Sequence, residues 1–117
     1  MPYIQISTTR ALTDGEKKEL KSCVFSAASL LNKPRQYVMV HILDGQTLSK
    51  GEGAGNAAFC DARILGSPAR DACDRFAAKL TDDIARIAQV EPPQIYLTVE
   101  ELSMCYMDGV YLGGRSR

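Results

Sequence analysis

A pattern of strand, helix and strand occurs twice along this chain, and it limits the possible folds more than any other feature. Strands that alternate with helical segments are typical of βαβ units. The predicted elements are a strand over 3–7, a helix between Thr13 and Asn32, a strand over 37–43, a glycine-rich loop over 44–55, a strand over 57–65, a helix between Ser67 and Pro92, and a strand over 94–99.

The two units also share residues. Residues 34–38 read Pro-Arg-Gln-Tyr-Val and residues 92–96 read Pro-Pro-Gln-Ile-Tyr, so the two segments begin 58 positions apart, about half the chain. Because βαβ connections are right-handed, two such units predict an α+β fold, a four-stranded mixed sheet with both helices on one face. We expect a single domain over 1–117 with pseudo-repeats at about 2–44 and 57–101.

The predicted sheet has an uncovered face, although its strands carry apolar residues. An exposed apolar face of this kind is typical of an interface, so we expect an oligomer. Closure of several sheets around a ring would also remove the exposed strand edges.

Local signals predict the boundaries of the helices. Thr13 and Glu16 form the capping-box pattern that begins a helix. Ser67 and Pro68 suit the N-cap and first position of the second helix. The strand over 37–43 is apolar on both sides, and we therefore expect it to be buried.

Composition excludes several function classes. The 117 residues include 14 basic and 14 acidic side chains, so the chain lacks the basic surface expected of a nucleic-acid binder. No apolar run is long enough to span a membrane or to act as a signal peptide, and we expect a cytoplasmic protein. The cysteines form no CxxC pair, which argues against a zinc ribbon or a thioredoxin-type site; they are Cys23, Cys60, Cys73 and Cys105.

Pro2 stands at the start of the first predicted strand. Removal of Met1 would give this strand a free secondary amine, whose pKa responds to burial and to nearby cations. With Met1 attached, the Pro2 nitrogen is an amide and has no basic lone pair. The alternative is an ordinary first residue, since strands tolerate proline there.

Other polar residues have both structural and functional interpretations. Lys33 either compensates the dipole at the end of the first helix or faces the same pocket as Pro2, where it would lower the pKa of the amine and bind an anion. Tyr96 and Thr98 share one strand face and either line a pocket or pack across strands. His41 is expected to be a hydrogen-bonded structural histidine.

Several segments resemble the macrophage migration inhibitory factor (MIF) and D-dopachrome tautomerase family of the tautomerase superfamily. The resemblance covers residues 2 to about 101. It rests on Pro2 and on three segments, Lys-Pro-Arg-Gln-Tyr-Val-Met-Val-His over 33–41, Ile-Leu-Gly over 64–66 and Gln-Ile-Tyr-Leu-Thr over 94–98.

This resemblance implies a homotrimer in which three sheets wrap into a barrel. It also implies a keto–enol tautomerase of phenylpyruvate or dopachrome-type substrates, with Pro2 as general base. Lys33 would bind the substrate carboxylate beside the Leu65 backbone N–H, and Tyr96 and Thr98 would come from the neighbouring subunit. Neither a metal nor an organic cofactor is implied.

The chain departs from the family pattern at three places. Thr98 stands where mammalian members typically have asparagine. Residues 57–60 read Ala-Ala-Phe-Cys in place of the family's CxxC, so the associated thiol oxidoreductase activity should be absent or altered. The tail lacks the usual tryptophan, and Tyr106 and Tyr111 are candidates for the aromatic rim of the pocket.

Two other functions remain open. One is a MIF-like signalling protein with a vestigial pocket, secreted by a non-classical route and binding a receptor. The other is a related decarboxylase or dehalogenase of small acids, in which Arg63 or Arg70 would serve in the pocket.

Overall fold

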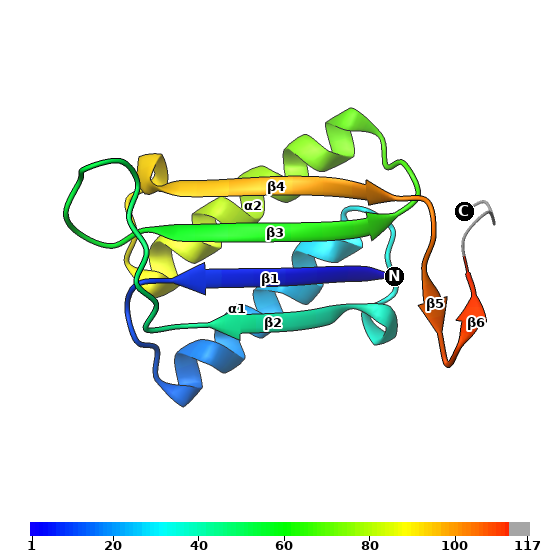
Figure 1. Cartoon of the computed structure of the whole chain (residues 1–117), viewed down its shortest axis with the longest axis horizontal. Coiled ribbons are helices and arrows are strands. Elements are labelled where there is room, and N and C mark those ends of the chain that lie inside the picture. Colours follow the sequence, from blue (N-terminus) through cyan, green and yellow to red (C-terminus); the bar gives the residue numbers. More distant parts are fainter. Residues whose placement is uncertain (113–117) are drawn as a thin grey trace.

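The computed structural model describes residues 1–112, which form a four-stranded sheet with two helices on one face (Figure 1). No helix within this range is long and apolar enough to cross a membrane. The elements are β1 (Pro2–Thr8), α1 (Asp14–Ser29), η1 (Arg35–Tyr37), β2 (Met39–Leu43), β3 (Ala58–Leu65), α2 (Arg70–Ala88), η2 (Pro92–Gln94), β4 (Ile95–Leu102), β5 (Tyr106–Met107) and β6 (Val110–Tyr111).

The strand order is β2-β1-β3-β4, with β1 parallel to β2, β3 parallel to β4, and β1 antiparallel to β3. The predicted α+β fold with a mixed sheet is therefore confirmed. The register pairs Pro2 with Ile64 and Leu65 with Leu102. As a result, the start of β1 lies at the same end of the sheet as the ends of β3 and β4 (Figure 1).

Helix α1 begins as predicted. The Glu16 backbone N–H donates to Thr13 Oγ1 (3.1 Å), and the Thr13 N–H donates to Glu16 Oε1 (2.9 Å), which completes the capping box. The helix ends at Ser29, and Asn32 then adopts a left-handed φ of 58°. This turn brings the chain from α1 back to the sheet.

Two predicted boundaries are wrong. Helix α2 begins at Arg70 with Ala69 as an N-cap that makes no side-chain hydrogen bond, while the Ser67 hydroxyl lies 3.2 Å from Glu101 Oε1 instead. Pro68 precedes the helix. Strand β2 begins at Met39 rather than residue 37, because η1 takes up Tyr37.

Strand β2 is also less buried than its sequence indicates. It lies at the edge of the sheet, and the side chains of Met39 and His41 are exposed on the face that carries no helix. Apolar residues on both sides of a strand predict burial only where both faces are covered.

The core lies between the sheet and the two helices. Alternate residues of β1 and β3 point into it, and the buried stripes of α1 and α2 cover them; the fully buried large side chains include Ile4, Ile6, Leu20, Val24, Ile64, Phe76, Leu80 and Ile84.

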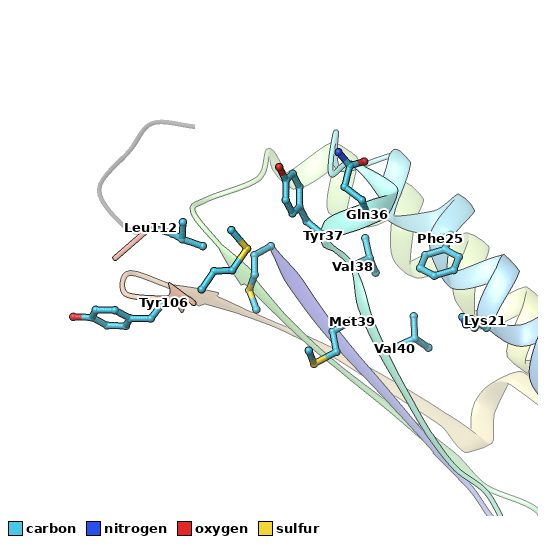
Figure 2. Close-up of a pocket in the computed structure, with 11 residues that line it drawn as sticks. Lys21, Phe25, Gln36, Tyr37, Val38, Met39, Val40, Tyr106 and Leu112 are labelled. Atoms are coloured by element: carbon cyan, nitrogen blue, oxygen red, sulfur yellow. The ribbon is translucent and has the colours of Figure 1, made fainter. Parts of the chain in front are cut away.

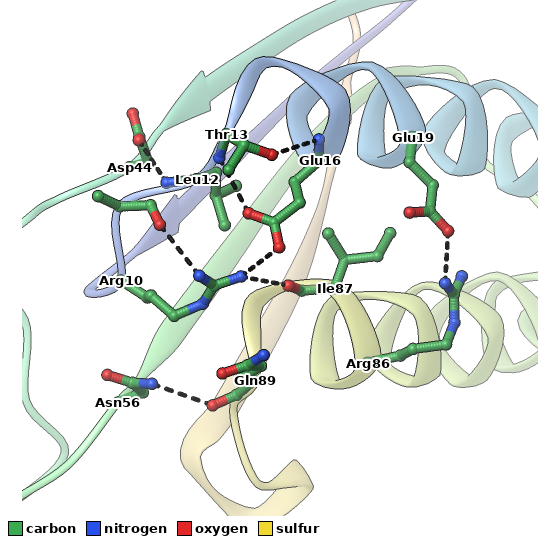
Figure 3. Close-up of polar contacts among 11 residues, drawn as sticks. Arg10, Leu12, Thr13, Glu16, Glu19, Asp44, Asn56, Arg86, Ile87 and Gln89 are labelled. Carbon is green, nitrogen blue, oxygen red and sulfur yellow. Dashed lines mark hydrogen bonds and ion pairs between the residues drawn. The ribbon is translucent and has the colours of Figure 1, made fainter.

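Arg10 lies at one end of this core. Its Nη2 donates to Glu16 Oε2 (2.6 Å) and to the Ile87 carbonyl (2.9 Å), so it joins the start of α1 to the end of α2 (Figure 3).

The opposite face of the sheet carries no helix, as predicted, but it is more polar than expected. Tyr3 Oη lies 2.7 Å from His41 Nδ1, and Gln5 Nε2 donates to the same Tyr3 oxygen (3.1 Å). Arg63 Nη2 pairs with Asp61 Oδ2 at 3.4 Å. The prediction of a hydrogen-bonded His41 is therefore confirmed. The prediction of an apolar sheet face is wrong, because polar and charged side chains occupy the middle of that face.

Strands β5 and β6 form a hairpin that the sequence did not indicate. The hairpin stands off the end of the sheet where β1 begins (Figure 1). The rings of Tyr106 and Tyr111 pack at a centroid distance of 5.5 Å. The C-terminal arginines at 115 and 117 lie outside the described residues.

Candidate functional site

Pro2 is fully buried and fixed by the sheet. Its partner across β3 is Ile64, so the prolyl ring points toward the core. The next backbone group of β3, the Leu65 N–H, donates to the Met1 carbonyl oxygen (3.3 Å). The N-terminus therefore continues the sheet, and its position is as well defined as that of an inner strand.

Lys33 lies at the same end of the sheet. The backbone N–H of Lys33 donates to the Ala28 carbonyl (3.3 Å) after the turn at Asn32, and its ammonium donates to the Leu65 carbonyl (3.2 Å). This bond directs a positive charge toward the N-terminus. Burial, and then the charge of Lys33, lower the pKa of the Met1 amino group.

The structure therefore brings together Pro2, Lys33 and Leu65, which the sequence assigns to three distant segments. The carbonyl of Leu65 holds Lys33, while its N–H faces the N-terminal residue. This arrangement places the N-terminal residue, a cation and a backbone N–H donor within one cluster. Such a cluster suits an anionic ligand next to a base.

Tyr96 and Thr98 do not join this cluster within one chain. They lie on the exposed face of β4, opposite Phe59 and Asp61 of β3. Those partners precede Leu65 by six and four residues, or about 20 Å and 13 Å of strand at ~3.3 Å per residue.

A groove of about 730 Å³, lined in part by Met1, follows the outer edge of β2 (Figure 2). Tyr37 of η1 and Tyr106 of β5 line it, and Phe25 and Lys21 of α1 lie at the far end. Its walls are mostly apolar. Tyr106 therefore stands at a pocket, as the sequence suggested, and Tyr111 packs behind it.

Cys105 is the residue at this site that sequence reasoning missed. Its Sγ lies 3.3 Å from Met1 Sδ, and the N-terminal amine interacts electrostatically with it as well as with Lys33. The Leu112 N–H donates to the Cys105 carbonyl (2.8 Å) and closes the hairpin that positions the thiol. No motif marks this position, because only the hairpin brings it back to β1.

Arg63 and Arg70, the two candidates for a decarboxylase or dehalogenase, are engaged elsewhere. Arg63 pairs with Asp61 on the exposed sheet face, and Arg70 Nε pairs with Asp74 Oδ1 (2.9 Å) on the surface of α2. Neither lines the groove at Met1.

Comparison with known proteins places this architecture in a family. The family profile described as macrophage migration inhibitory factor (MIF) matches residues 1–109. A search of curated protein sequences found no match.

Solved structures share the fold at low sequence identity. Leishmania major MIF2 aligns with a TM-score of 0.89 at 19% identity, over 96% of this chain and 97% of that chain. The MIF homologue of Prochlorococcus marinus aligns with a TM-score of 0.86 at 17% identity, over 95% and 99%. Pt0534, in its structure inactivated by 2-oxo-3-pentynoate, aligns with a TM-score of 0.81 at 16% identity, over 93% and 94%. With a family match over nearly its whole length, the chain belongs to the MIF family.

Proposed function

We propose that this protein is a cofactor-independent keto–enol tautomerase of 2-oxo acids such as phenylpyruvate, with the amine of Pro2 as general base. The observation that carries the proposal is the cluster of Pro2, Lys33 and the Leu65 N–H at one end of the sheet. Membership of the MIF family supports isomerase-type activity. Inactivation of the similarly folded Pt0534 by a 2-oxo acid derivative is consistent with the same substrate chemistry.

The reaction needs Met1 to be removed, because an amide nitrogen is not a base. The neutral Pro2 amine then takes a proton from C3 of the 2-oxo acid, and the C3–H electrons form the C2=C3 bond of an enolate. A proton returned to the oxygen gives the enol, and the reverse sequence gives the ketone. A base positioned in this way typically increases the reaction rate by a factor of about 10²–10⁴.

Lys33 and Leu65 stabilise the negative charge of the substrate. The ammonium of Lys33 and the Leu65 N–H would bind the carboxylate, and their position next to the base orients C3 toward it. Burial and the charge of Lys33 lower the pKa of the Met1 amino group. After processing, the same two causes would favour the neutral form of the adjacent Pro2 amine, which is the basic form.

The proposed active form is a homotrimer. The sheet face without helices would line the inside of the ring, and Tyr96 and Thr98 of a neighbouring copy would close the pocket. Their separation from Pro2 within one chain supports this part of the proposal.

The test is Pro2→Gly assayed with phenylpyruvate, after intact mass has shown that Met1 is absent from both proteins. We expect at least a hundredfold loss of kcat/KM, of the size a general base contributes, ~10²–10⁴. Undiminished tautomerisation would exclude Pro2 as the base.

Lys33→Met tests the carboxylate site. We expect a raised KM, because a charge that binds the carboxylate throughout the reaction contributes mainly to binding. Lys18→Met is the matched control, since Lys18 is exposed on α1. An equal change in both variants would argue against a binding role for Lys33.

A further inference from the structure

We infer that the fold protects the Met1–Pro2 peptide bond, so that Met1 is removed before β1 pairs with β3 or not at all. The proposed function needs this cleavage, but the inference concerns the bond itself. Its test measures molecular mass, so the inference and the proposed function can fail separately.

The bond between Met1 and Pro2 is part of the sheet. Its carbonyl oxygen accepts the Leu65 N–H (3.3 Å), and the prolyl residue that follows is fully buried opposite Ile64. The Met1 side chain is held as well, since its Sδ lies 3.3 Å from Cys105 Sγ. The residues on both sides of the bond are therefore in contact with the folded chain.

An aminopeptidase must reach the same atoms. To hydrolyse the bond, it polarises the Met1 carbonyl, delivers water to the carbonyl carbon and protonates the Pro2 nitrogen as that nitrogen leaves. In the folded chain, the Leu65 N–H is bonded to this carbonyl oxygen and Pro2 is buried. Cleavage therefore needs the start of β1 to open first, and its rate follows the population of the opened form.

This opening is unfavourable because β1 is an inner strand. It pairs with β2 from Tyr3 onward and with β3 from Pro2 onward. Exposure of Pro2 breaks the hydrogen bond from Leu65 and returns a fully buried apolar ring to water. One such ring and one such hydrogen bond keep the opened fraction at about 0.01 or less.

Synthesis of the chain leaves a limited time for processing. The partner strand β3 ends at Leu65, so the N-terminus stays unpaired on that side until synthesis has reached this residue. At ~5–20 residues per second, this takes roughly 3–13 s. A chain that keeps Met1 beyond this stage folds with its N-terminus covered.

A retained Met1 blocks two groups of the proposed site at once. The amide bond removes the basic lone pair of the Pro2 nitrogen, and the Met1 carbonyl accepts the Leu65 N–H. Removal of this one residue frees both groups. The fraction of chains with a free Pro2 amine is therefore set during synthesis, and treatment of the folded protein with an aminopeptidase does not raise it.

The experiment uses protein that retains Met1, produced while the host aminopeptidase is inhibited and confirmed by intact mass. The folded protein and a peptide of residues 1–8 are incubated together with purified methionine aminopeptidase, and mass spectrometry follows the loss of Met1 from each. We expect release from the folded protein to be about a hundredfold slower or more, in proportion to the opened fraction. Equal rates would overturn the inference.

Two core variants locate the protection within the fold. Ile64 lies opposite Pro2, whereas Ile84 is equally buried but lies near the far end of α2. Both alanine variants leave a cavity in the core, but only Ile64→Ala leaves it beside the start of β1. We expect Ile64→Ala to release Met1 about tenfold faster than Ile84→Ala, or more. Equal release would assign the opening to unfolding of the whole chain and would overturn the role of the start of β1.

Processed protein separates this result from the proposed function. Pro2-dependent tautomerisation by processed protein, together with slow release from the folded precursor, would support both. Inactive processed protein would exclude the proposed function, and the rates of Met1 release would still decide the inference.

Discussion

Replacement of Ile64 by alanine should show whether packing in the core aligns the Pro2 nitrogen for catalysis, in addition to stabilising the fold. Ile64 is 0% exposed and lies opposite Pro2 in the sheet. Its truncation removes three buried carbon atoms and leaves a cavity, at a cost of about 2–5 kcal/mol. A chain of 117 residues is typically stable by about 6–18 kcal/mol, so the variant should remain folded.

The cavity lies next to the prolyl ring, and the ring loses one of the walls that orient its nitrogen. Displacement of a catalytic group by about 1 Å can cost on the order of a hundredfold in rate. We expect kcat/KM for phenylpyruvate to fall by tenfold or more, within that range. Ile84→Ala is the matched control, because Ile84 is also 0% exposed but lies near the far end of α2.

Urea unfolding followed by far-UV circular dichroism measures the stability of both variants, since the chain has no tryptophan. Tautomerisation is assayed below the unfolding transition. The two variants should lose similar stability, but only Ile64→Ala should lose activity. Full activity in Ile64→Ala at the expected loss of stability would refute the view that core packing aligns Pro2.

Three further predictions concern individual side chains. Lys33→Met should raise the pKa of the Pro2 amine, because a positive neighbour favours the neutral form, and the acid limb of the pH–rate profile should move to higher pH. Burial raises the pKa of the Cys60 thiol to about 12, so a thiol reagent at pH 8 should label it only after denaturation; labelling in the native state would contradict this. Arg10→Met should cost about 0.5–1.5 kcal/mol in urea unfolding, since the Ile87 carbonyl loses a part-buried hydrogen-bond donor.

The sequence predicted the helices and the strands of the main sheet, with errors at two boundaries and in the burial of β2. Thr13 and Glu16 form the expected capping box. The repeated βαβ pattern correctly predicted the four-stranded sheet. The error at Ser67 has a physical reason. Its hydroxyl lies by Glu101, on a strand distant in sequence, and local capping preferences contain no information on that contact.

The candidate site was predictable in part. Pro2 and Lys33 could be placed at one end of the sheet because a βαβ unit returns the chain there, and the structure has them there. Cys105 could not be placed. Its position depends on a hairpin of two-residue strands, too short to produce a recognisable alternation of apolar residues.

The positions of Tyr96 and Thr98 connect catalysis to assembly. Tyr96 and Thr98 lie opposite residues of β3 that precede Leu65 by six and four positions. At ~3.3 Å per residue, Tyr96 is therefore about 20 Å and Thr98 about 13 Å from Leu65 along the strands of the same chain. No rotation of a side chain covers the longer of these distances, so a pocket that contains both Pro2 and Tyr96 must lie between two chains. Activity per chain should then fall on dilution below the dissociation constant of the oligomer, and in Tyr96→Ala it should fall without a loss of the monomer fold. Constant activity per chain in a preparation that sedimentation shows to be monomeric would mean that one chain carries the complete site.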